Sequence, residues 1–184
     1  MNYDAFSHGQ IKSKLWLCEE LEKQVKIESR VAILGGWYNV LGFLLLTRNK
    51  DKILSILNID IDSSAIDVAN KITEGWMIGP EANVNNIVAD ASTYNYEGFD
   101  IVINCSPEHM HSNDWFNNIA SGTMVCVQSS DIDSNDDVWK VTNPNASIED
   151  LVEKYPLSQT LYKDSMEFVY GDWGYKRFMI IGIK

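Results

Sequence analysis

Three residues in the first third of the chain have the types and spacing of a nucleotide-binding site. Gly35 and Gly36 directly follow an apolar run at 31–34, and Asp60 lies at the end of the next apolar run. An acid about 20–25 residues after a glycine turn, at the end of the second strand of a βαβ unit, accepts hydrogen bonds from both ribose hydroxyls. The spacing therefore predicts an adenosine-containing ligand, provided that the Asp60 carboxylate faces the ligand rather than solvent or only its own backbone.

A second group of polar side chains follows the apolar run 101–103. The segment 104–109 combines an amide, a hydroxyl, an acid and an imidazole, with a proline that fixes the turn. We interpret Asn104, Glu108 and His109 as catalytic residues, with Glu108 or His109 deprotonating or orienting an accepting nitrogen or oxygen. The alternative interpretation is a polar loop that caps the next helix.

The elements that must position these residues alternate between strands and helices. Apolar runs predict strands at 31–34, 53–61, 86–89, 100–104 and 123–128, and helical periodicity predicts helices at about 41–47, 62–72, 114–120 and 147–156. Ser7 and Gln10 form a capping-box pattern that opens a first helix. Further along that helix, Lys14 either lies on the polar side or reaches a carboxylate of the ligand. The segments 166–170 and 177–183, with glycines between them, predict an antiparallel hairpin.

This order predicts an α/β protein with a doubly wound, mostly parallel sheet and right-handed crossovers. We expect one domain over residues 1–184. It would consist of an N-terminal helix (1–28), a cofactor-binding core (29–130), and a C-terminal helix and hairpin (131–184).

Charge and hydropathy exclude several classes of partner. The net charge of −11 disfavours nucleic acid, because phosphate binding depends on lysine and arginine. No apolar run reaches the roughly 18–20 residues of a membrane span, and the N-terminus lacks a secretory pattern. We therefore expect a cytoplasmic protein whose substrate is a small molecule more readily than a protein, with a homo-oligomer or a partner subunit left open.

The cysteines and histidines do not form a metal site. Cys18, Cys105 and Cys126 are far apart among apolar neighbours, which predicts buried thiols rather than disulfides. His109 and His111, with His8 far away, do not have the spacing of zinc ligands, so we expect no metal.

Four short motifs match a known family in order and position: Val31-Ala32-Ile33-Leu34-Gly35-Gly36, Ile59-Asp60-Ile61-Asp62, Val88-Ala89-Asp90-Ala91-Ser92 and Phe99-Asp100-Ile101-Val102-Ile103-Asn104-Cys105-Ser106. Over nearly its whole length the chain resembles the class I S-adenosylmethionine-dependent methyltransferases. The resemblance implies a Rossmann-like methyltransferase fold of seven strands, six parallel and the last antiparallel, and S-adenosylmethionine as cofactor.

In that family the glycine loop contacts the amino-acid part of the cofactor, the acid ending strand two binds the ribose, the acid after strand three meets the adenine amine, and residues after strand four line the reacting methyl. Carried onto this sequence, the resemblance and the sheet-edge position of the loop imply these cofactor-binding residues: Gly35, Gly36, Trp37, Tyr38, Asp60, Ile61, Asp90, Ala91, Asn104 and Ser106. Asp62 is better explained as a helix N-cap.

The first motif departs from the family pattern. Ile33 stands where the family usually has an acid, Trp37 stands at the second glycine position, and Gly36 is an extra glycine. We predict a methyltransferase that acts on a nitrogen or oxygen of an unidentified acceptor. The departure favours one alternative, a catalytically inactive binding or scaffold module. Another alternative, an NAD-dependent oxidoreductase, shares the Asp60 argument but lacks Gly-x-Gly-x-x-Gly.

Overall fold

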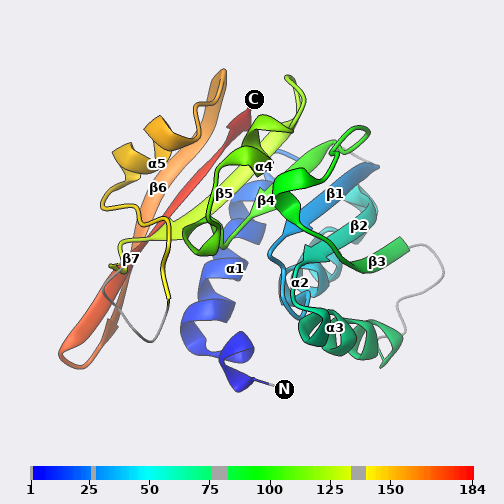
Figure 1. Cartoon of the computed structure of the whole chain (residues 1–184), viewed down its shortest axis with the longest axis horizontal. Coiled ribbons are helices and arrows are strands. Elements are labelled where there is room, and N and C mark those ends of the chain that lie inside the picture. Colours follow the sequence, from blue (N-terminus) through cyan, green and yellow to red (C-terminus); the bar gives the residue numbers. More distant parts are fainter. Residues whose placement is uncertain (1, 26–27, 76–82, 134–139) are drawn as a thin grey trace.

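A single seven-stranded sheet forms the centre of the molecule in the computed structural model, which describes residues 2–25, 28–75, 83–133 and 140–184. The strand order across the sheet is β3-β2-β1-β4-β5-β7-β6 (Figure 1). The strands are β1 (Ser29–Leu34), β2 (Ile53–Asp60), β3 (Asn83–Val88), β4 (Ile101–Asn104), β5 (Met124–Ser130), β6 (Gln159–Tyr170) and β7 (Trp173–Ile183).

Neighbouring strands from β3 to β5 pair in parallel, and β7 pairs antiparallel with both β5 and β6. Six strands therefore share one direction and β7 opposes them. This arrangement confirms the predicted mostly parallel α/β sheet with a closing C-terminal hairpin.

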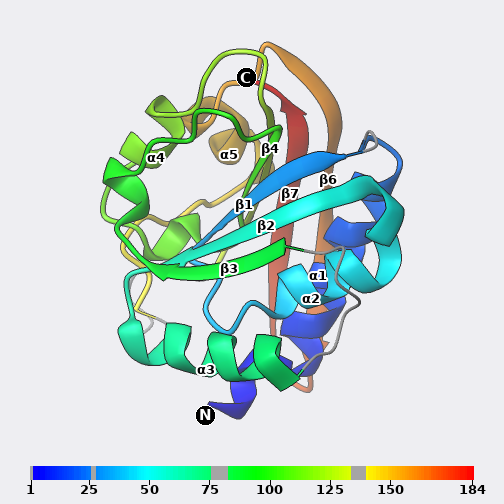
Figure 2. The same ribbon diagram turned by 90° about the vertical axis from the view of Figure 1, so that its right-hand side faces the viewer.

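Helices cover both faces of the sheet (Figure 2). The helices α1 (His8–Glu22), α2 (Val40–Asn49) and α3 (Ser63–Gly75) lie on one face, and α4 (Asp114–Asn117) and α5 (Ile148–Lys154) lie on the other. Short 3-10 helices are found at η1 (Tyr3–Phe6), η2 (Lys50–Lys52), η3 (Ala91–Thr93) and η4 (Pro107–His109).

The apolar run of β1 is continuous because its two sets of side chains enter two different cores. Val31 and Ile33 pack in the core that contains α1 and α2, whereas Ala32 and Leu34 pack in the core that contains α4 and α5. A strand that is buried on both faces has no polar side to alternate with its apolar one.

Several predicted boundaries differ from the structure, mostly in the edge strands. The third strand begins at Asn83 rather than residue 86, and the hairpin's first strand at Gln159 rather than 166. Both extensions lie in edge strands and mix polar residues with apolar ones such as Val84 and Leu161, so they contain no continuous apolar run. The strand β5 continues through Ser129 and Ser130, beyond the predicted end at 128, and α4 ends at Asn117 rather than 120. Residues 76–82 and 134–139, which fall between predicted elements, lie outside the described residues.

Within the described residues, no helix is both long and apolar enough to span a bilayer. The three cysteines are free thiols: Cys18 and Cys126 are buried, while Cys105 is only partly so. Burial raises the pKa of Cys18 to about 12 and that of Cys105 to about 11, so neither is a thiolate at neutral pH.

Candidate functional site

A cavity of about 930 Å³ opens at the carboxyl ends of the parallel strands, where β1 and β4 lie side by side although their connections run in opposite directions. Crevices at such switch points are where open α/β sheets bind ligands. The cavity is lined by nearly all of the predicted site residues: Gly35, Gly36, Trp37, Tyr38, Asp60, Ile61, Asp90, Ala91, Ser106, Glu108 and His109.

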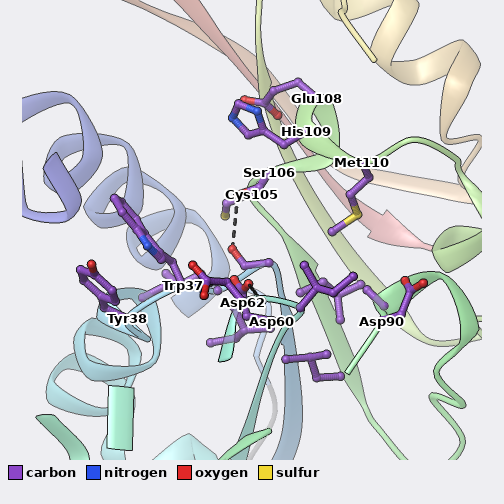
Figure 3. A pocket seen from close by; sticks show the side chains of 18 of the residues that line it. Trp37, Tyr38, Asp60, Asp62, Asp90, Cys105, Ser106, Glu108, His109 and Met110 are labelled. Atoms are coloured by element: carbon purple, nitrogen blue, oxygen red, sulfur yellow. Dashed lines mark hydrogen bonds between the residues drawn. The ribbon is translucent and has the colours of Figure 1, made fainter. Parts of the chain in front are cut away.

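Asp60 lies at the end of β2, and its carboxylate is anchored by two backbone amides. One oxygen (Oδ2) accepts from the Trp37 N–H at 2.8 Å, and the other (Oδ1) accepts from the Asp62 N–H at 2.9 Å. The first bond joins β2 to the glycine loop, so the side chain is not held only by its own turn (Figure 3). Because each carboxylate oxygen can accept a second hydrogen bond, one acceptor position per oxygen remains.

The loop after β1 has the backbone of a glycine loop with a tryptophan in it. Gly35 has φ +56°, and Trp37, at the family's second glycine position, has φ +52°. That conformation strains any residue with a Cβ by roughly 1–2 kcal/mol. The Trp37 indole stacks on Tyr38 with ring centroids 4.7 Å apart, and the Tyr38 hydroxyl accepts from the backbone N–H of Asn2. The two rings thus form one wall of the cavity (Figure 3).

Gly36, the extra glycine, has a packing role that sequence reasoning missed. A Cβ on Gly36 would lie 1.9 Å from the Oδ1 atom of Asn58, a fully buried residue of β2. The amide of Asn58 donates to the Trp37 carbonyl and to the side chain of Asn86. Asn58 therefore supports the loop from below, and only glycine leaves room for it.

Two further acids that line the cavity, Asp62 and Asp90, cap helices. Asp62 accepts hydrogen bonds from both the N–H and the hydroxyl of Ser64, which confirms it as the cap of α3 and lowers the pKa of its carboxyl. Asp90 accepts from the Ser92 N–H through Oδ1 at 2.8 Å and lies across the cavity from Trp37 (Figure 3). Neighbouring Ala91 is buried and lines the space between them.

The loop after β4 separates the three predicted catalytic residues. Asn104 is fully buried and does not line the cavity: its Oδ1 accepts from the Ser106 N–H at 2.9 Å, which shapes the turn. Glu108 is also buried, and its carboxylate pairs with the Arg177 guanidinium at 3.2 Å. His109 is exposed at the rim of the cavity. Of the three side chains, only the imidazole of His109 is freely accessible.

Arg177 of β7 was not predicted as a site residue. Besides pairing with Glu108, it donates to the Cys105 carbonyl at 2.6 Å, so it fixes the loop after β4 at two points. Its partners lie about 70 positions earlier in the chain, and no local pattern marks such a contact.

The N-terminal segment also contributes to the cavity, through Asn2, Asp4, Gln10 and Lys14. The capping box at the start of α1 is only half formed. The Ser7 hydroxyl accepts from the Gln10 N–H, but the Gln10 side chain accepts from the Lys14 ammonium instead of closing the box. Desolvation lowers the pKa of Lys14 to about 8.

No group of three histidine, cysteine, aspartate or glutamate residues is arranged to hold a metal ion in the part of the chain that the structure describes. The chain matches no protein-family model. No curated protein is similar to it in sequence.

Solved structures share the fold at low sequence identity. The N-methyltransferase NodS from Bradyrhizobium japonicum WM9 superposes with a TM-score of 0.69 at 11% identity, covering 95% of this chain and 97% of NodS. YcgJ from Bacillus subtilis gives 0.66 at 12% identity, covering 94% and 98%. M. capricolum TrmK, solved with S-adenosylhomocysteine, gives 0.55 at 17% identity, covering 90% and 67%. The chain therefore has the fold of the class I S-adenosylmethionine-dependent methyltransferases.

Proposed function

We propose that this chain is an S-adenosylmethionine-dependent methyltransferase that acts on a nitrogen or oxygen of a small-molecule acceptor. One observation supports this most strongly. The Asp60 carboxylate, bonded to the glycine-loop backbone, lines a cavity at the switch point of a methyltransferase-type sheet.

The residues beside the cavity fit the adenosyl part of the cofactor. Asp60 keeps two acceptor positions for the ribose hydroxyls, and Asp90 keeps Oδ2 for the adenine amine. Ile61 and Ala91 supply apolar surface for the base. A Cβ on Gly35 would lie 3.4 Å from Ser106 and Met110, so glycine keeps the passage between the two loops open.

When bound, S-adenosylmethionine supplies a methyl group activated by a sulfonium, which passes to the acceptor by in-line displacement. The chain's part is largely positioning. The faces of Trp37 and Tyr38 attract a cationic centre, and Ser106 bridges to the Gly35 carbonyl at 3.4 Å, which aligns the loops after β1 and β4. His109, whose imidazole reaches the rim, is the group we assign to hold the proton that the acceptor loses.

In this proposal Glu108 has a positioning role. Its carboxylate is buried against Arg177, so it positions the loop that carries His109 rather than contacting the acceptor. Asn104 acts in the same way, through its bond to Ser106.

The acceptor class is argued from the charge of the chain and from the fold of the described residues. A net charge of −11 opposes nucleic acid. Within the described residues, nearly every element belongs to the sheet or its covering helices. NodS, which has a similar fold, is an N-methyltransferase, and we extend nitrogen acceptors to this chain as part of the proposal.

Calorimetric titration with S-adenosylhomocysteine tests the proposal. We expect saturable binding with an affinity in the micromolar range, and a lower affinity for adenosine. Absence of binding at millimolar S-adenosylhomocysteine would overturn the proposal.

The second candidate is a methyltransferase-like module without transfer activity. The replacement of the motif acid by Ile33 and the strained Trp37 favour it. A protein that binds S-adenosylhomocysteine yet transfers no methyl group to any member of a panel of amines, carboxylates and phenols would match this candidate. A thermal shift with NAD but none with S-adenosylhomocysteine would instead match an oxidoreductase.

A further inference from the structure

A lysine inside the cavity has no acidic partner. Lys14 of α1 is partly buried and lines the cavity, and it donates to the neutral side-chain oxygen of Gln10. Among the ion pairs of the described residues, none includes Lys14. An ammonium has three donors, so two are left for a ligand.

The groups that face Lys14 do not neutralise it. They are Cys105 after β4, Cys18 on α1, Arg177 on β7 and Asp4 in η1. Both thiols are protonated at neutral pH because burial raises their pKa values. Arg177 is positive and opposes a second cation, and it already binds Glu108 and the Cys105 carbonyl. Asp4 acts on Lys14 only at longer range, without an ion pair between them.

Lys14 also lies at the opposite end of the cavity from Asp60 and Asp90. Asp60 ends β2 and Asp90 follows β3, whereas Lys14 interacts electrostatically with Cys105 after β4 and Arg177 on β7, on the far side of β1. Figure 3 shows Asp60 and Asp90 on the far side of Cys105 from Glu108. Lys14 and Arg177 therefore lie at one end of the cavity, where Arg177 is already paired with Glu108, and Asp60 and Asp90 lie at the other. A ligand that fills the cavity needs hydroxyl or amine donors at the end with Asp60 and an anion at the end with Lys14.

We propose that Lys14 is an anion-binding residue of this cavity and that the group it binds is a carboxylate. The inference rests on the proposed function, in which two molecules could bring a carboxylate to this place: the cofactor, through its amino-acid end, and the acceptor. In both cases the same charge-assisted hydrogen bonds form with the ammonium. A protonated lysine in a desolvated position gains more from such a partner than an exposed lysine does.

The first experiment compares two ligands that differ in the carboxylate. S-adenosylhomocysteine carries the amino-acid group, and 5′-methylthioadenosine lacks it. In calorimetric titrations at pH 7, Lys14→Met is expected to weaken binding of S-adenosylhomocysteine roughly ten- to hundred-fold and to leave methylthioadenosine unchanged. Lys14→Arg keeps the charge and is expected to retain most of the discrimination.

Lys12→Met is the matched control. Lys12 lies on the same helix but contacts the ring of Phe168 outside the cavity, so its replacement should change neither affinity. Because Met is apolar and similar in length to Lys, the Lys14→Met variant is expected to fold, which its thermal unfolding checks.

The second experiment identifies the source of the carboxylate and reads Lys14 directly. In protein with ¹³C-labelled lysine, the Lys14 signal is assigned by its loss in Lys14→Met, and its pKa is measured with each ligand. An anion bound to the ammonium raises the pKa from about 8. If S-adenosylhomocysteine raises it and added acetate does not raise it further, the cofactor supplies the carboxylate. If acetate raises it only after S-adenosylhomocysteine is bound, the acceptor supplies it.

The proposal fails if neither S-adenosylhomocysteine nor acetate raises the pKa of Lys14 and Lys14→Met binds S-adenosylhomocysteine as tightly as the unaltered protein. That result leaves the proposed function standing, since the adenosyl ligand still binds. If the unaltered protein binds neither adenosyl ligand, the proposed function fails, and acetate titration of the ligand-free protein still decides whether Lys14 binds anions.

Discussion

At the scale of single residues, the Asp60 carboxylate both binds the backbone of the loop after β1 and lines the cavity. The Oδ2 atom of Asp60 accepts from the loop after β1, and Oδ1 accepts from the N–H of Asp62, so each oxygen has one further acceptor position. Trp37 adopts a glycine conformation at a cost, and the stacking on Tyr38 offsets part of it. The glycine-loop geometry is thus retained without the second glycine.

Replacing Asp60 by Ala is expected to weaken binding of S-adenosylhomocysteine by about 1.5–3 kcal/mol, because two charge-assisted hydrogen bonds to the ribose are lost. Calorimetry measures the change. Asp67→Ala on the exposed side of α3 is the matched control and should leave the affinity unaltered. Equal affinities for Asp60→Ala and the unaltered protein would show that Asp60 only supports the loop.

Replacing His109 by Gln is expected to reduce methyl transfer by about 10²–10⁴-fold, the usual contribution of a general base. The affinity for S-adenosylhomocysteine should stay within about two-fold of the original, since the proton transfer involves only the acceptor. Single-turnover rates and calorimetry on the same preparation separate the two effects. A variant that loses affinity but keeps its turnover contradicts the role we assign.

Gly36→Ala is expected to destabilise the fold by about 1–3 kcal/mol, since the new methyl group overlaps the buried Asn58 amide. Urea unfolding measures it. The contrasting variant is Gly75→Ala at the end of α3, where nothing lies within 4 Å and a small gain is expected. The double variant Gly36→Ala/Asn58→Ser should recover part of the loss; a loss as large as in the single variant would contradict the contact.

At the scale of elements, the loop after β4 and Arg177 of β7 line one side of the cavity together. The buried pair of Glu108 and Arg177 connects the loop after β4 to the closing hairpin, and the backbone N–H groups of Thr142 and Asn143 donate to the Glu108 carbonyl. The hairpin thereby sets the position of the loop that carries His109.

Arg177→Met is expected to lower the free energy of unfolding by about 3–5 kcal/mol, because it leaves the Glu108 carboxylate buried without its partner. Chemical unfolding of the single variant and of Arg177→Met/Glu108→Gln tests this. The double variant removes both charges and should recover most of the stability. If both variants are equally unstable, the packing of the Arg177 side chain rather than its charge stabilises the loop.

At the scale of the whole molecule, the desolvated ammonium of Lys14 lowers the free energy of unfolding. The pKa of Lys14 falls from 10.5 to about 8 on folding, mainly through desolvation. Below pH 8 the lysine is protonated in both states, so the full cost is present. Between pH 8 and 10.5 only the unfolded state keeps the proton, so the cost declines as the pH rises.

Lys14→Met is therefore expected to stabilise the ligand-free protein by roughly 3 kcal/mol at pH 7, and the gain should shrink to its pH-independent part by pH 10.5. Urea unfolding between pH 7 and 10.5, taken as the difference from the unaltered protein, isolates this residue from the buried thiols and phenols. Lys12→Met, on the same helix but outside the cavity, is the matched control for the loss of a lysine side chain. If the difference in free energy of unfolding between Lys14→Met and the unaltered protein does not change with pH, Lys14 is not desolvated in the folded protein.

The sequence by itself determined the order of the elements, the closing hairpin, and the meeting of Gly35 and Asp60 at one sheet edge. Each of these follows from local patterns: apolar runs buried on both faces, a glycine turn, and an acid where a strand ends. Parallel strands with right-handed crossovers then bring their carboxyl ends together in almost every protein of this class.

Only the tertiary structure decided which side chains reach the cavity. It buried Asn104, paired Glu108 with Arg177 from the other end of the chain, turned Gln10 toward Lys14, and placed Asn58 beneath Gly36. Most of these contacts join segments that are remote in sequence. The contact of Gln10 with Lys14 depends on which side-chain rotamers the two residues of one helix adopt. Neither hydrophobic periodicity nor turn chemistry carries that information, because both describe only a residue's near neighbours along the chain.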